Sequence, residues 1–347
     1  MEVVSLKNNK RQVNIELLRI ISMILVLLVH YNFPLNGKLS LEMYENSIMH
    51  YIGVASLCSL DFVCVNCFII ISGYFGIRWK LGGVLSYLFQ ISFWGGMIYL
   101  ICWLLGLHNF NPMAMVKQMT LFLFGVNWFF VAYLGLYMIA PVLNAYIEKV
   151  SEKELGIFVA VFYIFQTFFG WITPECREFV SGMSFVSFAG LYLLGAYLRK
   201  SSWVIFQWEA WTNLGVYLGV GVICVIISIG SRCVGATQSI YSYISPLQII
   251  QTIYLFLFCK ALKIAKGEKI VLFFSSSAFA ALLMHSWDGG DLYYKGLYWI
   301  DSNIQYPFFA SILYILLFFS VACVLDKVRI WFWQHVIEDS LIRRNHV

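Results

Sequence analysis

Arg19 and His30 lie eleven positions apart in the first apolar run of the chain, which extends from Val13 to Phe33. At about 100° per residue, eleven steps along a helix return to nearly the same face, about 16 Å further along the axis. An ionisable side chain inside a membrane costs roughly 2.5 kcal/mol or more, so it usually faces a protein interior and serves function. A helix over this run therefore presents a cation near one membrane surface and an imidazole deeper in the bilayer to the same interior.

Glu16 lies three residues before Arg19, where a helix places the two side chains next to each other. We therefore expect an ion pair that leaves the arginine charge available to a polar cavity. An arginine near a membrane surface can also simply extend toward the lipid headgroups. The face that Arg19 shares with His30 favours the functional interpretation.

The end of the second apolar run carries a further set of cations. Gly73 and Gly76 allow a close backbone approach or an opened helix end there. Arg78 and Lys80 follow at the cytoplasmic mouth, where positive residues also serve as ordinary flanks of a span. Since guanidinium groups bind phosphate well, Arg19, Arg78 and Lys80 would meet a phosphate-rich cofactor that comes from the cytosol.

Two acidic or titratable positions lie deeper in apolar segments. Asp61 falls within the second run, and an intramembrane carboxylate usually pairs, protonates or lines water. It is expected either to pair with a buried donor or to bind an acceptor substrate. His285 ends a late apolar run and is followed by Trp287 and Asp288. This composition suits the recognition of a polyol, although a histidine beside a tryptophan also serves as an interfacial anchor.

These residues require a scaffold of membrane-spanning helices. Hydrophobic residues make up 61% of the 347 residues and charged residues 12%, and the mean hydropathy is +0.78. Charged residues reach about a quarter in soluble domains, so the expected fold class is all-α, a polytopic membrane helix bundle. Ten segments are long enough to cross a bilayer core of about 30 Å, namely residues 13–33, 51–75, 82–106, 119–146, 154–172, 182–198, 211–230, 241–262, 270–287 and 304–325.

The longer connections are expected at 34–50, 107–118 and 288–303. The fourth segment is long for one crossing, so residues Met115 to Phe124 are alternatively a separate half-helix in the interface. Residues 1–326 are expected to form one transmembrane domain, and residues 327–347 a cytoplasmic interfacial tail.

The distribution of basic residues sets the orientation. With both termini in the cytoplasm, eighteen of the 23 Lys and Arg residues fall on the inside, as the positive-inside rule requires. The net charge of +5 then lies on cytoplasmic loops next to anionic lipid, and no nucleic acid partner is needed. Cys64 and Cys67 match a CxxC pattern, but thiols in an apolar helix are usually small packing residues, so we expect no metal.

The chain resembles the acyltransferase family 3 membrane proteins, which move acyl groups from acyl-CoA to extracytoplasmic glycans. The resemblance rests on Arg19 and His30 with an acidic residue three before the arginine, on the Phe-Ile-Ile-Ile-Ser-Gly-Tyr stretch 68–74, on the Trp-Phe-Phe-Val-Ala-Tyr-Leu stretch 128–134, and on a late helix that ends in His285. The ten-span plan is also similar. Glu16 stands where Asp is usual, and Ala280 and Ala281 stand where the family tends to carry Gly and Tyr.

The resemblance implies an O-acyltransferase that takes an acyl group, expected to be acetyl, from cytoplasmic acetyl-CoA. The implied acceptor is a hydroxyl of an extracytoplasmic or lipid-linked polysaccharide, and the implied location is a bacterial cytoplasmic membrane. The implied site residues are His30, Arg19 and Glu16 for catalysis, Arg19, Ser72, Arg78 and Lys80 for the cofactor, and Asp61, Trp128, His285 and Asp288 for the acceptor. His30 acts either as a general base or as a nucleophile that carries the acyl group, and both remain open.

Two other functions fit parts of the pattern. A transporter or flippase of glycolipid or polysaccharide precursors would also have about ten spans and a polar interior, but the middle spans carry few paired charges and no internal repeat is visible. A membrane-bound acyltransferase of the separate family with one histidine in an apolar helix would use His285 as its base. That interpretation leaves Arg19 and His30 without a role.

Overall fold

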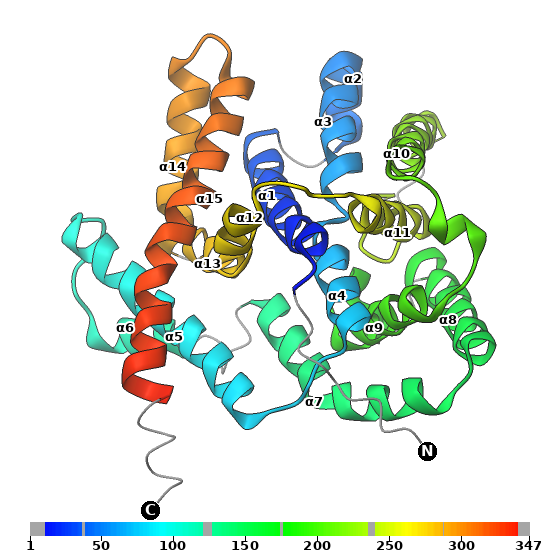
Figure 1. The fold of residues 1–347 in the computed structure, drawn as a ribbon. Helices are drawn as coiled ribbons and strands as arrows, with labels where there is room; N and C mark the ends of the chain where they lie inside the picture. Colours follow the sequence, from blue (N-terminus) through cyan, green and yellow to red (C-terminus); the bar gives the residue numbers. More distant parts are fainter. Residues whose placement is uncertain are drawn as a thin grey trace, which may run out of the picture.

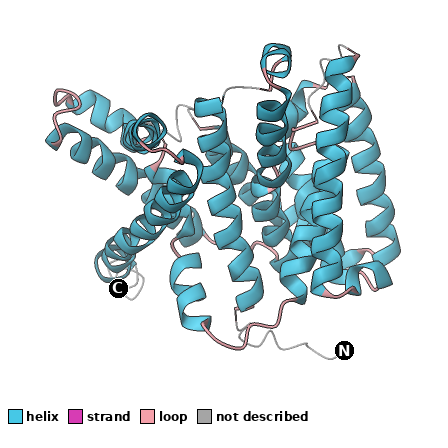
Figure 2. Cartoon of the chain, turned by 90° about the horizontal axis from the view of Figure 1, so that it is seen from above, coloured by secondary structure: helices cyan, strands magenta, loops and turns pink. Residues whose placement is uncertain are grey.

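The computed structural model describes residues 11–36, 39–120, 127–173, 176–234, 240–286 and 288–338. These residues form helices and no strands (Figure 2), which confirms the all-α prediction. The helices are α1 Val13–Asn36, α2 Leu41–Asn46, α3 Ile48–Asp61, α4 Cys64–Phe75, α5 Leu81–Leu104, α6 Pro112–Met119, α7 Trp128–Lys149, α8 Glu152–Gln166, α9 Phe185–Lys200, α10 Ala210–Cys233, α11 Pro246–Ala261, α12 Glu268–Ser275, α13 Ala278–Met284, α14 Asp288–Asn303 and α15 Pro307–Phe332, with short π or 3₁₀ segments at Thr167–Ile172, Arg177–Gly182, Val204–Gln207 and Trp333–Glu338.

Among the described residues, seven helical segments are long and apolar enough to cross a membrane. They are Val13–Asn32, Ile48–Phe75, Leu81–Leu104, Trp128–Lys149, Glu152–Ile172, Ala210–Cys233 and Pro307–His335. Two further predicted spans correspond to α9 and α11, which are shorter, with 16 residues each. The predicted span 270–287 is divided into α12 and α13. The protein is therefore a multi-pass helical membrane protein, and the count of ten stays a prediction.

Two predicted boundaries are wrong. Residues 288–303, expected as a loop, form α14, which packs against α15 beside it (Figure 1). Tyr293, Leu297 and Ile300 recur at helical spacing and are buried, but polar residues between them lower the hydropathy of the segment. α7 begins at Trp128, so the start of the fourth span predicted at residue 119 is wrong. α6, Pro112–Met119, overlaps the first part of the alternative half-helix Met115 to Phe124, and residues 121–124 of that half-helix lie outside the described residues.

α1 lies at the centre of the bundle. It packs against α3, α4, α11, α12, α13, α14 and α15 (Figure 1). Its buried residues include Ile15, Leu18 and Ser22, which are spaced three and four residues apart. Groups from both halves of the chain can therefore meet around this one helix.

The predicted second span is broken between Asp61 and Cys64, where α3 ends and α4 begins. A break inside a membrane exposes backbone carbonyl groups that need donors. The Tyr217 hydroxyl donates to the Leu60 carbonyl at 2.7 Å, and the Gln251 amide donates to the Ser59 carbonyl at 2.9 Å. Side chains of α10 and α11 thus stabilise the break.

The end of α4 has the close approach and the opened geometry that its glycines predicted. A Cβ atom at Gly73 would clash with the Tyr192 carbonyl of α9. Gly76 ends the helix with a φ of +80°, a left-handed conformation that glycine adopts without strain. The sharp end of α4 sets the direction of the connection that carries Arg78 and Lys80.

α15 runs without interruption across the boundary predicted at residue 326. Asp326 is fully buried, and its carboxylate accepts two hydrogen bonds from the Arg329 guanidinium at 2.7 and 2.8 Å. The Trp94 indole donates to the same carboxylate at 2.9 Å. This contact fixes α5 to α15, and one turn before Trp94, α5 carries Gln90.

Candidate active site

One face of α1 carries all the residues of the helix that line the two central cavities. Five of these residues, Glu16, Arg19, Met23, Val26 and His30, alternate at three- and four-residue spacing, and Val29 also lines the second cavity from the edge of this face. Glu16 and Arg19 line one cavity, and Met23, Val26 and His30 line the other. Arg19 and His30 therefore both face the interior of the bundle, as predicted. They line two different cavities within it.

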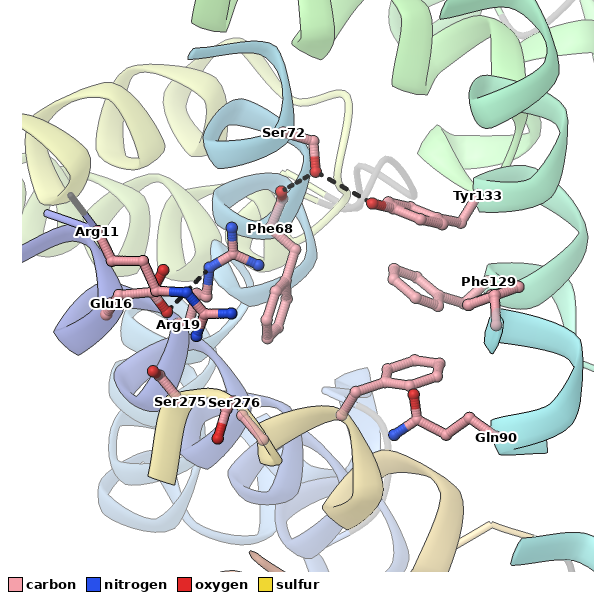
Figure 3. A pocket seen from close by; sticks show the side chains of 13 residues that line it. Arg11, Glu16, Arg19, Phe68, Ser72, Gln90, Phe129, Tyr133, Ser275 and Ser276 are labelled. Carbon is pink, nitrogen blue, oxygen red and sulfur yellow. Dashed lines mark hydrogen bonds and ion pairs between the residues drawn. The ribbon is translucent and has the colours of Figure 1, made fainter. Parts of the chain in front are cut away.

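The arginine cavity has a volume of about 350 Å³ and lies near the beginning of α1. Figure 3 shows Arg11, Glu16 and Arg19 on one side and Tyr133 and Phe129 across from them. Among the described residues, its lining is Arg11, Glu16, Arg19, Phe68, Ser72, Tyr87, Gln90, Phe129, Tyr133, Ser275, Ser276, Ala278 and Phe279. Two guanidinium groups and several hydroxyl groups surround a space that suits an anionic or phosphate-bearing ligand.

Arg19 forms the predicted ion pair with Glu16. Its Nε lies 3.5 Å from the Glu16 carboxylate, and 36% of the arginine side chain remains exposed. The guanidinium is thus oriented by Glu16 and still accessible to the cavity. Across the cavity, the Ser72 and Tyr133 hydroxyl groups lie 3.4 Å apart (Figure 3).

The histidine cavity has a volume of about 140 Å³ and lies toward the end of α1. Its lining is Met23, Val26, Val29, His30, Cys64, Val65, Phe68, Asn127, Trp128, Phe129, Met183, Tyr243, Phe279, Leu282, His285 and Ser286. Most of these side chains are apolar, with a few polar groups among them. An apolar pocket with a few convergent polar groups is the usual form of a small-molecule site.

His30 and His285 are in direct ring contact. Their ring centroids are 4.5 Å apart, with the planes at 67° in an edge-to-face arrangement. The first helix and α13 therefore bring together the two histidines that sequence reasoning assigned to different roles. Two imidazolium charges at this distance would repel strongly, so the pair can hold one extra proton far more readily than two.

Backbone contacts determine which ring nitrogen carries the proton. Nδ1 of His30 lies 2.8 Å from the Val26 carbonyl, and Nδ1 of His285 lies 3.0 Å from the Ala281 carbonyl. A carbonyl oxygen only accepts, so Nδ1–H must be the donor in each ring. In a neutral imidazole Nε2 is then the basic nitrogen. Each histidine can therefore accept a proton at Nε2.

His285 is held from its other side by α14. The ring of Tyr293 lies 5.6 Å from the His285 ring, centroid to centroid, and its hydroxyl donates to the Leu27 carbonyl at 2.8 Å. Tyr293 is fully buried. The segment expected as a loop thus positions a residue of the site.

Of the other predicted site residues, some line a cavity and some lie outside both cavities. Trp128 lines the histidine cavity, and its ring packs 5.8 Å from that of Tyr243. Asp288 begins α14, and its side chain lies outside the described residues. Arg78 and Lys80 are exposed in the connection after α4, and the lining of the arginine cavity does not include them.

Asp61 is buried at the end of α3 and lines neither cavity. Neither of its carboxylate oxygens has a hydrogen-bond partner among the described residues. It lies three residues before Cys64, which does line the histidine cavity. Asp61 therefore lies behind the wall of the histidine cavity. Of its two expected roles, pairing with a buried donor is not seen among the described residues.

Sequence reasoning gave no role to several lining residues. These are Phe68, Phe129 and Tyr133 of the arginine cavity: Phe68 lies four residues before Ser72, which was assigned to the cofactor, and Phe129 lies four residues before Tyr133. This helical spacing was visible within the two motif stretches and could have identified them. Tyr243 gives no such local signal.

Comparison with known proteins finds one family. The model of acyltransferase family 3, described as an acyltransferase domain, matches residues 12–327. The match covers nearly the whole chain and includes every described lining residue of the two cavities except Arg11. No curated protein and no solved structure matches the chain.

Proposed function

Because the chain belongs to acyltransferase family 3, we propose that it is a membrane O-acyltransferase that uses cytoplasmic acetyl-CoA and acetylates a hydroxyl group of an extracytoplasmic or lipid-linked polysaccharide. The observation that carries the proposal is the arrangement of the two cavities. A cationic chamber and a chamber with two basic imidazoles share a wall, as a phosphate-bearing donor and a reacting hydroxyl group require.

The donor enters from the side of Arg19. Arg11 and Ser276 line both the arginine cavity and an open groove of about 770 Å³, to which Lys269 and Lys327 also contribute. A path of positive charge therefore leads from the protein surface to Arg19. The phosphates of coenzyme A would lie along this path, and its thioester would point toward the histidines. Ser72 is assigned to the donor because it lines the same cavity.

Arg78 and Lys80 mark a second approach to the donor site. The Tyr137 hydroxyl donates to the Arg78 carbonyl at 3.2 Å, and Tyr137 lies one turn beyond Tyr133 on α7. The two cations thus lie further toward the end of α7 than the lining residue Tyr133. We assign them to the first capture of the donor, with a smaller effect on its affinity than Arg19.

His30 performs the chemistry at Nε2. The nitrogen takes the proton of the acceptor hydroxyl while the hydroxyl oxygen attacks the thioester carbonyl. The carbon–sulfur bond then breaks, and the departing thiolate of coenzyme A takes the proton from the imidazole. In the alternative, Nε2 itself attacks the thioester carbonyl, the carbon–sulfur bond breaks and the thiolate of coenzyme A leaves. The acceptor hydroxyl then attacks the acyl-imidazole, the carbon–nitrogen bond breaks, and the hydroxyl proton is taken up by the thiolate. Trp128 and His285 contact the acceptor beside the reacting group, and Asp288 is assigned to the acceptor side. Asp61 lines neither cavity, so it is given no direct contact with the acceptor.

The arginine cavity faces the cytoplasm in this proposal. α5 has 24 residues, so its ends lie about 36 Å apart, on opposite sides of a bilayer. Asn109 lies in the connection after α5, and Ser202 lies in the connection after α9, which is predicted to be cytoplasmic. In intact cells, an impermeant maleimide should label Asn109→Cys and should not label Ser202→Cys. The background would lack Cys176 and Cys233, the two described cysteines that are not buried. Labelling of Ser202→Cys from outside would reverse the orientation.

The direct test of the function is transfer of label. Membranes that contain the protein and its native glycans are incubated with acetyl-CoA labelled in the acetyl group. We expect label in the glycan fraction, and none in membranes that lack the protein. Labelled glycan would exclude a transporter function. If the protein consumes no acetyl-CoA but glycan precursor is still exported normally, the transporter function would be supported.

A further inference from the structure

Three phenylalanine side chains belong to both cavities. Phe68 of α4, Phe129 of α7 and Phe279 of α13 line the arginine cavity and also the histidine cavity. We call these three residues the phenylalanine wall. Anything that passes from Arg19 to His30 must pass between or beside these rings.

Neighbouring tyrosines hold the wall in place from the donor side. The rings of Phe129 and Phe279 lie 6.3 Å apart, centroid to centroid. Tyr133 stacks on Phe129 at 5.9 Å, and Tyr87 stacks on Phe279 at 5.6 Å. Phe129 is only 9% exposed. Aromatic pairs of this kind contribute about 0.5–1.5 kcal/mol beyond the area that they bury, so these contacts stabilise the positions of the wall residues.

The larger arginine cavity suits the body of the donor, and the smaller histidine cavity suits its acyl group. The arginine cavity measures about 350 Å³ and the histidine cavity about 140 Å³. Pockets for drug-sized ligands measure about 300–1,000 Å³, so the histidine cavity is too small for one. It has room for a short acyl group together with the reacting hydroxyl.

We propose that the phenylalanine wall selects short acyl chains and that it is the specificity filter of the enzyme. The inference rests on the proposed function, because it concerns the acyl group of the donor. A thioester carbonyl reaches Nε2 of His30 with its acyl group inside the histidine cavity. A longer acyl chain contacts the phenylalanine rings or the end of the histidine cavity before its thioester carbonyl reaches Nε2 of His30. Removal of one ring joins the two cavities and gives a longer chain space.

The experiment measures kcat/KM for acetyl-CoA, butyryl-CoA and hexanoyl-CoA in membranes that carry the native glycan acceptor. The variants are Phe279→Ala and Phe129→Ala, and Phe274→Ala is the matched control. Phe274 belongs to α12, packs on Phe319 of α15 and lines neither cavity. A pocket discriminates about 10- to 200-fold for each methylene group. We therefore expect the hexanoyl-to-acetyl ratio to rise at least about tenfold in both variants and to stay unchanged in the control.

Each other outcome has a definite meaning. A wild-type enzyme that uses hexanoyl-CoA as well as acetyl-CoA would overturn the filter and leave the acyltransferase function intact. The same holds for variants that keep acetyl transfer with an unchanged ratio. If an alanine variant unfolds in detergent, Phe279→Leu keeps an apolar side chain of smaller size, and its ratio decides the question. A wild-type enzyme that transfers no acyl group at all would remove the proposed function, and the filter with it.

Discussion

We expect His30→Gln to abolish acyl transfer and to leave the protein folded and inserted in the membrane. A glutamine side chain can donate to the Val26 carbonyl as Nδ1 of His30 does, but it offers no basic nitrogen at the position of Nε2. General acid–base catalysis contributes about 10²–10⁴ in rate, so transfer of labelled acetyl to the glycan should fall by at least that factor. The loss should appear in kcat at saturating acetyl-CoA.

Two further variants make this result specific. His50→Gln changes an exposed histidine of α3 and should transfer acetyl at the wild-type rate. His285→Ala removes the neighbouring ring, which lies 4.5 Å from His30, and should reduce transfer while leaving more turnover than His30→Gln. The opposite order, with near-native transfer by His30→Gln and none by His285→Ala, would assign the base to α13.

We expect Arg19→Ala to raise the KM for acetyl-CoA by about 10- to 100-fold and to change the affinity for the acceptor little. The guanidinium is held by Glu16 at 3.5 Å and is partly exposed to the cavity, so a phosphate can reach it. A hydrogen bond to a charged group contributes about 1.5–3 kcal/mol, and about 1.4 kcal/mol corresponds to a factor of ten. Arg19→Lys should recover part of the loss, because it keeps the charge without the planar fork.

The control for Arg19 is Arg177→Ala, which removes an exposed arginine far along the chain from the donor residues. Its KM for acetyl-CoA should equal that of the wild type. Arg78→Ala should raise the KM by a smaller factor than Arg19→Ala does. An unchanged KM in Arg19→Ala would show that Arg19 serves only as the partner of Glu16, and the donor site would then have to lie elsewhere.

Much of the molecule follows from local sequence. The helical class follows from composition, because 61% hydrophobic and 12% charged residues are compatible with a membrane bundle and not with a soluble domain. Helical periodicity placed Arg19 and His30 on one face and Glu16 beside Arg19, since the spacing of side chains on a helix is fixed by its geometry. The glycines after Ser72 correctly indicated a close approach of α4 and a sharp helix end.

Helix boundaries were the first features that the sequence left undecided. α14 escaped prediction because a helix packed on its neighbours needs only an apolar stripe, while a hydropathy average requires a long apolar run. The break after Asp61 is stabilised by Tyr217 and Gln251, which lie on other helices. No property of residues 51–75 alone indicates that those donors are present.

The sequence by itself determined the helical membrane fold, the family motifs and the shared face of Arg19 and His30, because each depends on composition or on spacing within one helix. Only the tertiary structure placed His285 against His30 and set Tyr293 behind it. It alone assembled the phenylalanine wall from α4, α7 and α13 and divided the interior into two cavities. The physical reason is that such contacts depend on how separate helices pack in three dimensions, and that packing is a property of all the helices together rather than of any one segment.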